Sequence, residues 1–174
     1  MDWSIADAIS LSLLPIFVLI LGLVIYDSTY WIIPVTILVS VLSVELMKPL
    51  IPSNRPDEAS GCDLFCINGP VGGQPGFPSG HMTMTTVIAS FLFYFSPNAY
   101  SFIIGLTYIA AMAYSRYAKS CHTPLQILAG TFYGYLCVFV VTNTGIYHLD
   151  RTYQDLKNST SHIVLDPPAG DSQV

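Results

Sequence analysis

Side chains that can bind and cleave a phosphate group stand at the borders of the apolar stretches of this chain. Arginine offers paired donors to pairs of phosphate oxygens, lysine adds a compact positive charge, and N–H groups at a helix start also bind anions. Imidazoles can attack phosphorus or transfer protons. A glycine-rich segment, 69–76, lies beside them in the sequence. We therefore predict a phosphate or pyrophosphate site formed by Lys48, Arg55, Ser79, Gly80, His81, Arg116 and His122.

The composition indicates that a membrane surrounds the elements that position these residues. Only 10% of the 174 residues are charged, against about 25% in an ordinary soluble domain, and 52% are hydrophobic. Residues 8–26 carry no charge and, at 1.5 Å per residue, nearly match a hydrocarbon core about 30 Å thick. These values exclude a soluble enzyme. The six basic residues form no patch, so we expect no nucleic acid partner.

Five uninterrupted apolar stretches predict an all-α fold, a polytopic transmembrane helical bundle of about five spans. One long Gly- and Pro-rich loop, 48–80, interrupts them. We expect residues 1–147 to form the membrane domain and the polar tail, 148–174, to be unstructured. Asp2 and Asp7 stand where a secretory leader carries Lys or Arg, so we expect the first stretch to be retained. The five stretches are 8–26, 29–47, 81–96, 99–115 and 123–147.

The number of spans brings the candidate residues together. In five antiparallel spans, the end of the second, the start of the third, the end of the fourth and the start of the fifth lie on one face of the bilayer. One additional or missing span between Lys48 and His122 would separate these residues. The succession of spans therefore predicts a single cationic site on one face.

The spacing of the same residues resembles the three signature motifs of the type 2 phosphatidic acid phosphatase family. The motifs are Lys48 followed after six residues by Arg55-Pro56, then Pro78-Ser79-Gly80-His81, then Ser115-Arg116 followed after five residues by His122. The resemblance implies an integral membrane, metal-independent phosphatase of lipid phosphates or diphosphates that needs no cofactor. Its partners would be the lipid substrate and the bilayer. Members of the family often have six spans, whereas this chain shows five.

The resemblance also implies a role for each residue. His122 would attack phosphorus and form a phosphohistidine, and His81 would protonate the leaving group and later activate water. The phosphate oxygens would be held by Lys48, Arg55, Ser79, Gly80 and Arg116. Because the attacking imidazole must be neutral and the acid must be protonated, we expect a bell-shaped dependence of activity on pH.

Gln126 departs from the family pattern, which usually has Asp at this position. The run from His122 to Gln126 resembles the dolichyl diphosphate phosphatase branch and favours a polyprenyl diphosphate substrate. A glutamine can orient the His122 ring but stabilises an imidazolium less than a carboxylate does. Alternatively, Thr123, Pro124 and Gln126 fit a capping box with Pro at the first helical position. Both interpretations of Gln126 stay open at this level.

Several of the other candidate residues could also have a purely structural role instead of binding phosphate. Lys48, Arg116 and Lys119 could be interfacial anchors, Ser79 could be an N-cap, and Glu45 could pair with Lys48 one turn on. A disulfide among three cysteines could form if their face is lumenal or external, and their spacing does not favour zinc. These cysteines are Cys62, Cys66 and Cys121.

Other functions compete with a phosphatase. A catalytically weak relative could bind phospholipid as a scaffold, and a phosphotransferase would share the phosphohistidine step. A transporter is disfavoured because the spans carry few polar groups near their midpoints. An endomembrane location, the endoplasmic reticulum, is favoured. The sequon at Asn158 lies on the opposite face and, if glycosylated, would put the site in the cytosol. The sequence predicts no oligomeric state.

Overall fold

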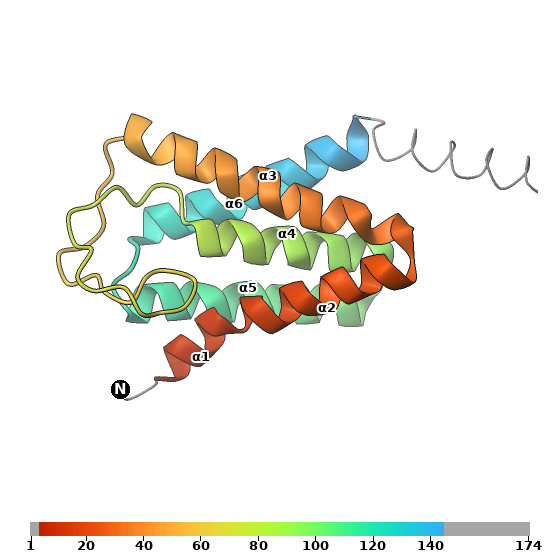
Figure 1. Cartoon of the computed structure of the whole chain (residues 1–174), viewed down its shortest axis with the longest axis horizontal. Helices are drawn as coiled ribbons and strands as arrows, with labels where there is room; N and C mark the ends of the chain where they lie inside the picture. Colours follow the sequence, from red (N-terminus) through yellow and green to blue (C-terminus); the bar gives the residue numbers. More distant parts are fainter. Residues whose placement is uncertain (1–3, 145–174) are drawn as a thin grey trace, which may run out of the picture. The chain divides into compact units, whose positions relative to one another are not determined.

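The protein is all-α throughout the part that the computed structural model describes, residues 4–144, and this confirms the predicted fold class (Figure 1). Two short 3-10 helices, η1 and η2, flank α3. The polar tail, 148–174, lies outside the described residues. The elements are α1 Ile5–Leu11, α2 Leu13–Tyr26, η1 Ser28–Trp31, α3 Ile32–Met47, η2 Lys48–Leu50, α4 Gly80–Phe95, α5 Ala99–Ala118 and α6 Pro124–Asn143.

Each of the five predicted spans corresponds to a helical segment of the structure. Among the described residues, three segments are long and apolar enough to cross a membrane by length and composition: Ile5–Tyr26, Ser28–Leu50 and Pro124–Asn143. Helix α4 has 16 residues, so its length is only about 24 Å, and it packs against α3 and α5. About five helical spans are therefore compatible with the structure, and the shortest of them is the central one.

The first span is broken into α1 and α2 at Ser12. Pro15 follows three residues later, and a proline both lacks an N–H group and clashes with the carbonyl four residues before it, here that of Leu11. The break lets α1 turn toward the end of α5, with which it packs.

Helix α6 approaches α4 closely because two glycines face it. A Cβ atom on Gly130 would lie 2.4 Å from the carbonyl oxygen of Ser79, and one on Gly134 would lie 2.6 Å from that of Thr83. The Thr83 hydroxyl also donates to the carbonyl of Gly130 at 3.2 Å. This spacing of small residues is typical of close helix packing in membranes, and here it fixes the start of α4 against α6.

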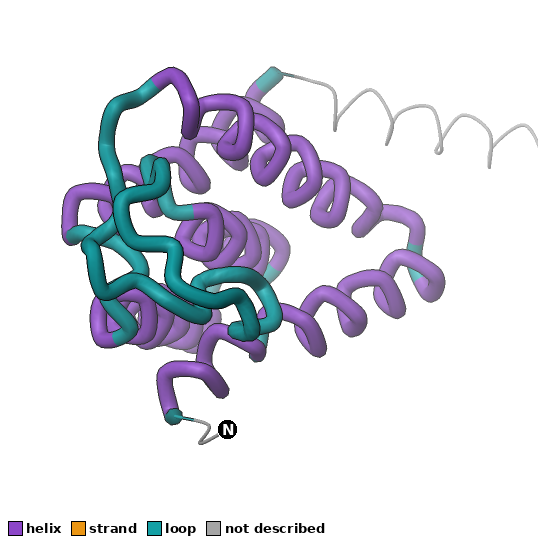
Figure 2. The backbone as a smooth tube through the Cα atoms, turned by 60° about the vertical axis from the view of Figure 1, so that its left-hand side comes forward, coloured by secondary structure: helices purple, strands orange, loops and turns teal. Residues whose placement is uncertain are grey.

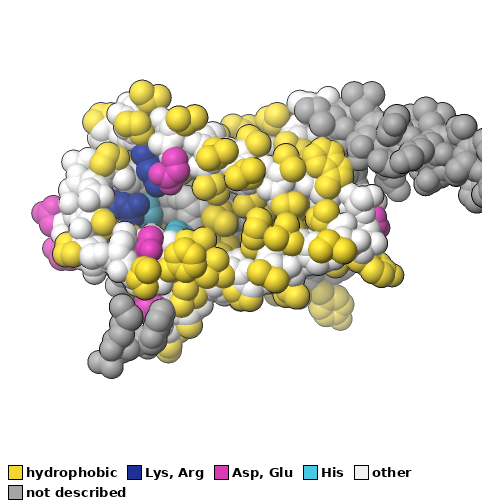
Figure 3. Space-filling model, in the orientation of Figure 1, with side chains coloured by type: hydrophobic (Ala, Val, Ile, Leu, Met, Phe, Trp, Pro, Cys, Tyr) yellow, Lys and Arg dark blue, Asp and Glu magenta, His cyan; other side chains and the backbone are white. Residues whose placement is uncertain are grey.

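The long loop lies where α3 ends, α4 begins, α5 ends and α6 begins (Figures 1 and 2). The four helix ends thus meet as the antiparallel succession predicts. The loop folds back on itself through isolated antiparallel bridges between Asn54 and Pro75 and between Ser60 and Pro70. Figure 3 shows apolar side chains over the helices and charged and histidine side chains gathered around a hollow near the loop.

Candidate active site

A cavity of about 340 Å³ lies at the end of the bundle where the loop sits. Its walls come from α3 and η2, the long loop, the first turns of α4 and the connection between α5 and α6. Five of the predicted residues line it, namely Lys48, Arg55, Gly80, His81 and His122. The other lining residues are Val41, Glu45, Cys62, Asp63, Leu64, Asn68 and Met84. Residues from three separate motifs therefore share one cavity of a size that suits a small ligand or head group.

His122 is held in one orientation and is 2% exposed. Its Nδ1 lies 3.2 Å from Oε1 of Gln126. The amide nitrogen of Gln126 donates to the carbonyl of Asn54 at 2.9 Å and to Ser53, so the amide oxygen must face the ring and accept from Nδ1–H. Nε2 is then the nitrogen that carries the lone pair, which is the form that a nucleophile needs.

Burial, and after it the positive charges of Arg55 and Arg116, lower the pKa of His122 to about 3. The hydrogen bond with Gln126 acts in the opposite direction but is outweighed. His122 is therefore neutral at physiological pH in the absence of a bound anion.

Gln126 fulfils both roles that the sequence left open. Its backbone N–H donates to the Thr123 hydroxyl at 3.3 Å, and its side-chain oxygen accepts from the Thr123 N–H at 3.2 Å, which is a capping box at the start of α6. The same oxygen faces His122. Gln126 is fully buried and does not line the cavity, so it acts on the cavity through the residues that it holds, His122 and the segment just before Arg55.

His81 is the second residue of α4, and its Nε2 is buried without a hydrogen-bond partner among the described residues. Ser79 stands at the N-cap position of α4, but its hydroxyl makes no capping bond and is likewise buried without a partner there. Ser79 is therefore the N-cap residue of α4 by position and backbone conformation, as the sequence allowed, but its side chain does not cap the helix. Ser79 does not line the cavity, and its N–H donates to the carbonyl of Gln126 at 3.1 Å.

The three cationic residues predicted for the site are Lys48, Arg55 and Arg116, and they have different partners. Lys48 forms an ion pair with Glu45, which is one of the two possibilities that the sequence left open for Glu45. Arg55 donates to the carbonyl of Cys121 at 3.4 Å. Among residues 4–144 the ion pairs are Lys48 with Glu45 and Lys119 with Asp7, so neither Arg55 nor Arg116 has a carboxylate partner. Arg116 is fully buried and Arg55 is half-buried. A buried cation without a paired counter-ion is costly, which favours an anionic ligand.

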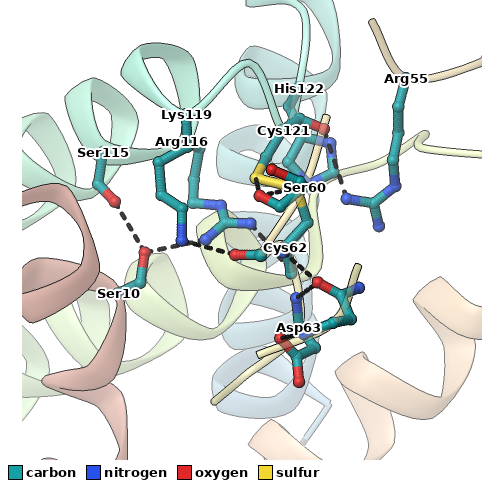
Figure 4. Close-up of a disulfide and its surroundings, with 12 residues drawn as sticks. Ser10, Arg55, Ser60, Cys62, Asp63, Ser115, Arg116, Lys119, Cys121 and His122 are labelled. Atoms are coloured by element: carbon teal, nitrogen blue, oxygen red, sulfur yellow. Dashed lines mark hydrogen bonds between the residues drawn. A yellow bond between two sulfur atoms is a disulfide. The ribbon is translucent and has the colours of Figure 1, made fainter. Parts of the chain in front are cut away.

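Arg116 is fully buried and lies behind the cavity wall rather than in it. Its guanidinium donates to the Ser10 hydroxyl at 2.9 Å and to the carbonyl of Cys62 at 2.9 Å, while its Nε has no partner among the described residues (Figure 4). Lys119 is held by Asp7 and by the carbonyl of Gly61. Neither side chain is an interfacial anchor that extends freely into water.

A disulfide joins Cys62 in the loop to Cys121, the residue before His122 (Figure 4). The carbonyls of these two cysteines accept from Arg116 and Arg55, respectively. The disulfide therefore ties the loop to both arginines and to His122. Cys66 and Cys137 are free thiols.

The glycine-rich segment, 69–76, does not line the cavity. Its backbone pairs instead with the strand-like segment around Arg55, because Gly73 and Gly76 donate to the carbonyls of Arg55 and Ser53. A Cβ atom on Gly76 would lie 2.7 Å from Cγ of Arg55. The segment thus supports Arg55 from behind. Sequence reasoning missed Ser10, Asp63 and Asn68, since an isolated Ser, Asp or Asn carries no recognisable spacing signal.

The family model described as PAP2 superfamily matches residues 29–149. The match contains every predicted site residue and leaves α1 and α2 outside it. No curated protein and no solved structure matches the chain.

Proposed function

The chain belongs to the PAP2 superfamily, whose members are in general phosphatases, and from this premise we propose that it hydrolyses a lipid phosphate or diphosphate at the membrane surface without a metal ion. The apolar helices agree with membrane association. The observation that carries the proposal is the cavity shared by His81, His122 and Arg55, with Arg116 behind its wall. Within residues 4–144 no carboxylate forms an ion pair with either arginine. An anion with several oxygens satisfies these groups.

The reaction proceeds through a phosphohistidine. The lone pair on Nε2 of His122 attacks phosphorus, and the bond between phosphorus and the leaving oxygen breaks. His81, as imidazolium, gives its proton to that oxygen. His81 then accepts a proton from water, whose oxygen attacks phosphorus and releases inorganic phosphate and free His122. Lys48, Arg55 and the start of α4 at Gly80 hold the oxygens, and the charge of Arg116 and the fixed position of Ser79 support them from behind.

Gln126 favours a diphosphate as the substrate. Its amide orients His122 but carries no charge to stabilise the imidazolium-like transition state. Cleavage of an anhydride expels a phosphate monoester, which is a better leaving group than the alkoxide expelled from a phosphatidic acid. The weaker stabilisation by glutamine therefore suits an isoprenoid diphosphate, in keeping with the resemblance to the dolichyl diphosphate phosphatase branch.

The disulfide supports an oxidising compartment for the site face. We propose that this face lies in the lumen of the endoplasmic reticulum. The hollow among charged residues lies next to an apolar surface (Figure 3), so a head group can reach the cavity while its chain stays in lipid.

Phosphate release from purified protein in detergent with EDTA tests this proposal. The panel contains a polyprenyl diphosphate, a polyprenyl monophosphate and phosphatidic acid, and the proteins are wild type, His122→Ala and the control Tyr117→Phe, whose side chain is exposed on α5. We expect chelator-resistant release from the diphosphate by wild type and the control, and a loss of at least about a thousandfold in His122→Ala.

Two other outcomes point to the competing functions. Lipid binding by wild type without release from any substrate would indicate a scaffold. Transfer of the phosphate to an added alcohol in preference to water would indicate a phosphotransferase. A further measurement uses substrate with a labelled phosphate and a rapid quench. An acid-labile phosphate label bound covalently to wild type but not to His122→Ala would indicate a phosphohistidine intermediate, whereas no label on either protein would indicate direct attack by water.

A further inference from the structure

We propose that Ser10, on the short helix α1, is a positioning residue for the phosphate site and acts by holding Arg116. The proposal rests on the proposed function above, because it takes the cavity to be an anion site. Ser10 lies outside the segment that the family model matches, 29–149. The first helix of this chain would therefore complete the site of the matched domain.

The contacts of Ser10 join it to the end of α5. Its hydroxyl accepts from Nη1 of Arg116 at 2.9 Å and lies 2.7 Å from the hydroxyl of Ser115. Ser115 in turn donates to the carbonyl of Ala6 at 2.6 Å. Ser10 is fully buried. This is a desolvated chain of hydrogen bonds between two helices, and it ends on a charged group (Figure 4).

The bond to Ser10 sets the direction of the guanidinium. Arg116 is held on its other side by the carbonyl of Cys62, and Cys62 lines the cavity. With both bonds in place, the charge of Arg116 lies directly behind the cavity wall, where a buried cation attracts an anion strongly. Without Ser10, Nη1 would be buried with an unmade hydrogen bond, and the guanidinium would turn to find another partner. The positive charge of Arg116 would then no longer lie directly behind the cavity wall.

Direct binding measurements test the proposal independently of turnover. Full-length protein in detergent is titrated with orthovanadate and with inorganic phosphate by calorimetry, and KM, kcat and the unfolding temperature are measured in parallel. We expect Ser10→Ala to weaken vanadate binding and raise KM by about tenfold, because a buried hydrogen bond to a charged group is lost, with a smaller change in kcat. Ser10→Thr, which keeps the hydroxyl, should restore most of the affinity.

Two matched controls distinguish a specific effect on the position of Arg116 from a general destabilisation of α1. Ser12→Ala removes a hydrogen bond to the Tyr108 hydroxyl at 3.0 Å, and Asp7→Asn removes the ion pair with Lys119. Neither residue forms a hydrogen bond with Arg116, so both variants should lower the unfolding temperature. Ser12→Ala should leave vanadate affinity within about twofold, and Asp7→Asn, which removes a negative charge that acts on Arg116, should not weaken it. Equal losses of affinity in Ser10→Ala and in both controls would overturn the proposal, as would unchanged affinity in Ser10→Ala.

Ser115→Ala provides a second test that does not depend on the folding of Ser10→Ala. It removes the hydrogen bonds of Ser115 with Ala6 and with Ser10 and leaves the bond between Ser10 and Arg116 in place. We expect lower stability with normal vanadate affinity, and a tenfold loss of affinity would contradict the proposal. If the proposed function is wrong, wild type releases no phosphate from any lipid. If only the inference about Ser10 is wrong, wild type is active and binds vanadate no better than Ser10→Ala.

Discussion

The imidazole of His122 is buried beside two guanidinium groups, and this environment makes its titration a direct test of the site. Burial and the charges of Arg55 and Arg116 lower its pKa to about 3. We expect the His122 signal in NMR spectra of protein labelled at histidine to show no protonation between pH 8 and pH 5. Arg55→Gln should raise the midpoint, because one repelling charge is removed. A wild-type midpoint near 6.5, assigned by comparison with His122→Asn, would contradict the described burial.

The same pKa shift links His122 to stability. The unfolded chain has an ordinary histidine that titrates near pH 6.5, whereas the folded protein binds this proton only near pH 3. Between these values the unfolded state holds more protons, so the contribution of His122 makes the protein less stable as the pH falls through this window. Chemical unfolding of wild type and His122→Asn at pH 7.5 and pH 5 should show a smaller loss in the variant.

Gln126 can be tested by substituting the aspartate that is usual in the family. Aspartate is shorter and lacks the amide donors, so the carbonyl of Asn54 and the Ser53 side chain lose their partner and meet a carboxylate instead. We expect Gln126→Asp to lower the free energy of unfolding by about 1–3 kcal/mol and also to slow phosphate release. Thermal unfolding together with kcat measures both effects. A faster enzyme of unchanged stability would show that only the ring-orienting role matters.

At the scale of elements, the approach of α6 to α4 depends on the absence of a side chain at Gly130. A methyl group there would lie 2.4 Å from the carbonyl oxygen of Ser79, a backbone atom that cannot move aside. We expect Gly130→Ala to destabilise the protein by about 1–3 kcal/mol and to reduce activity, because α6 also carries Gln126 next to His122. Thermal unfolding in detergent measures the first effect.

Gly22 on α2 offers the matched control. A Cβ atom at that position would meet nothing within 4 Å. Because alanine is the better helix former, Gly22→Ala should leave stability unchanged or raise it by up to about 1 kcal/mol. Similar losses in the two variants would show that close packing of α6 on α4 is not the cause.

At the scale of the whole molecule, the disulfide holds together segments that are 59 residues apart. Its removal should cost about 2–4 kcal/mol of stability and should also lower activity, since His122 and both arginines depend on the backbone of Cys62 and Cys121. We expect dithiothreitol to lower the activity and the unfolding temperature of wild type and to have no further effect on Cys62→Ser. Cys137→Ser, which removes a free thiol, should behave as wild type. Wild-type activity that is insensitive to full reduction would contradict this expectation.

Composition and spacing alone determined the number and order of the helical segments and the meeting of four helix ends at one site. The physical reason is that long apolar stretches must form helices in lipid, and the succession of antiparallel helices then fixes which ends share a face. The motif residues at those ends could therefore be assigned to one cavity before any contact was known. Lys48, Arg55, Gly80, His81 and His122 do line it.

Only the tertiary structure decided how these residues are held. Ser10 and Arg116 are 106 positions apart, and their bond depends on the break at Ser12 and on the packing of α1 against α5. The pairing of Cys62 with Cys121, the double role of Gln126 and the supporting role of segment 69–76 likewise arise from contacts between distant segments. Such contacts leave no periodic pattern in the chain, because each depends on the distance and direction between side chains that only the packed bundle defines.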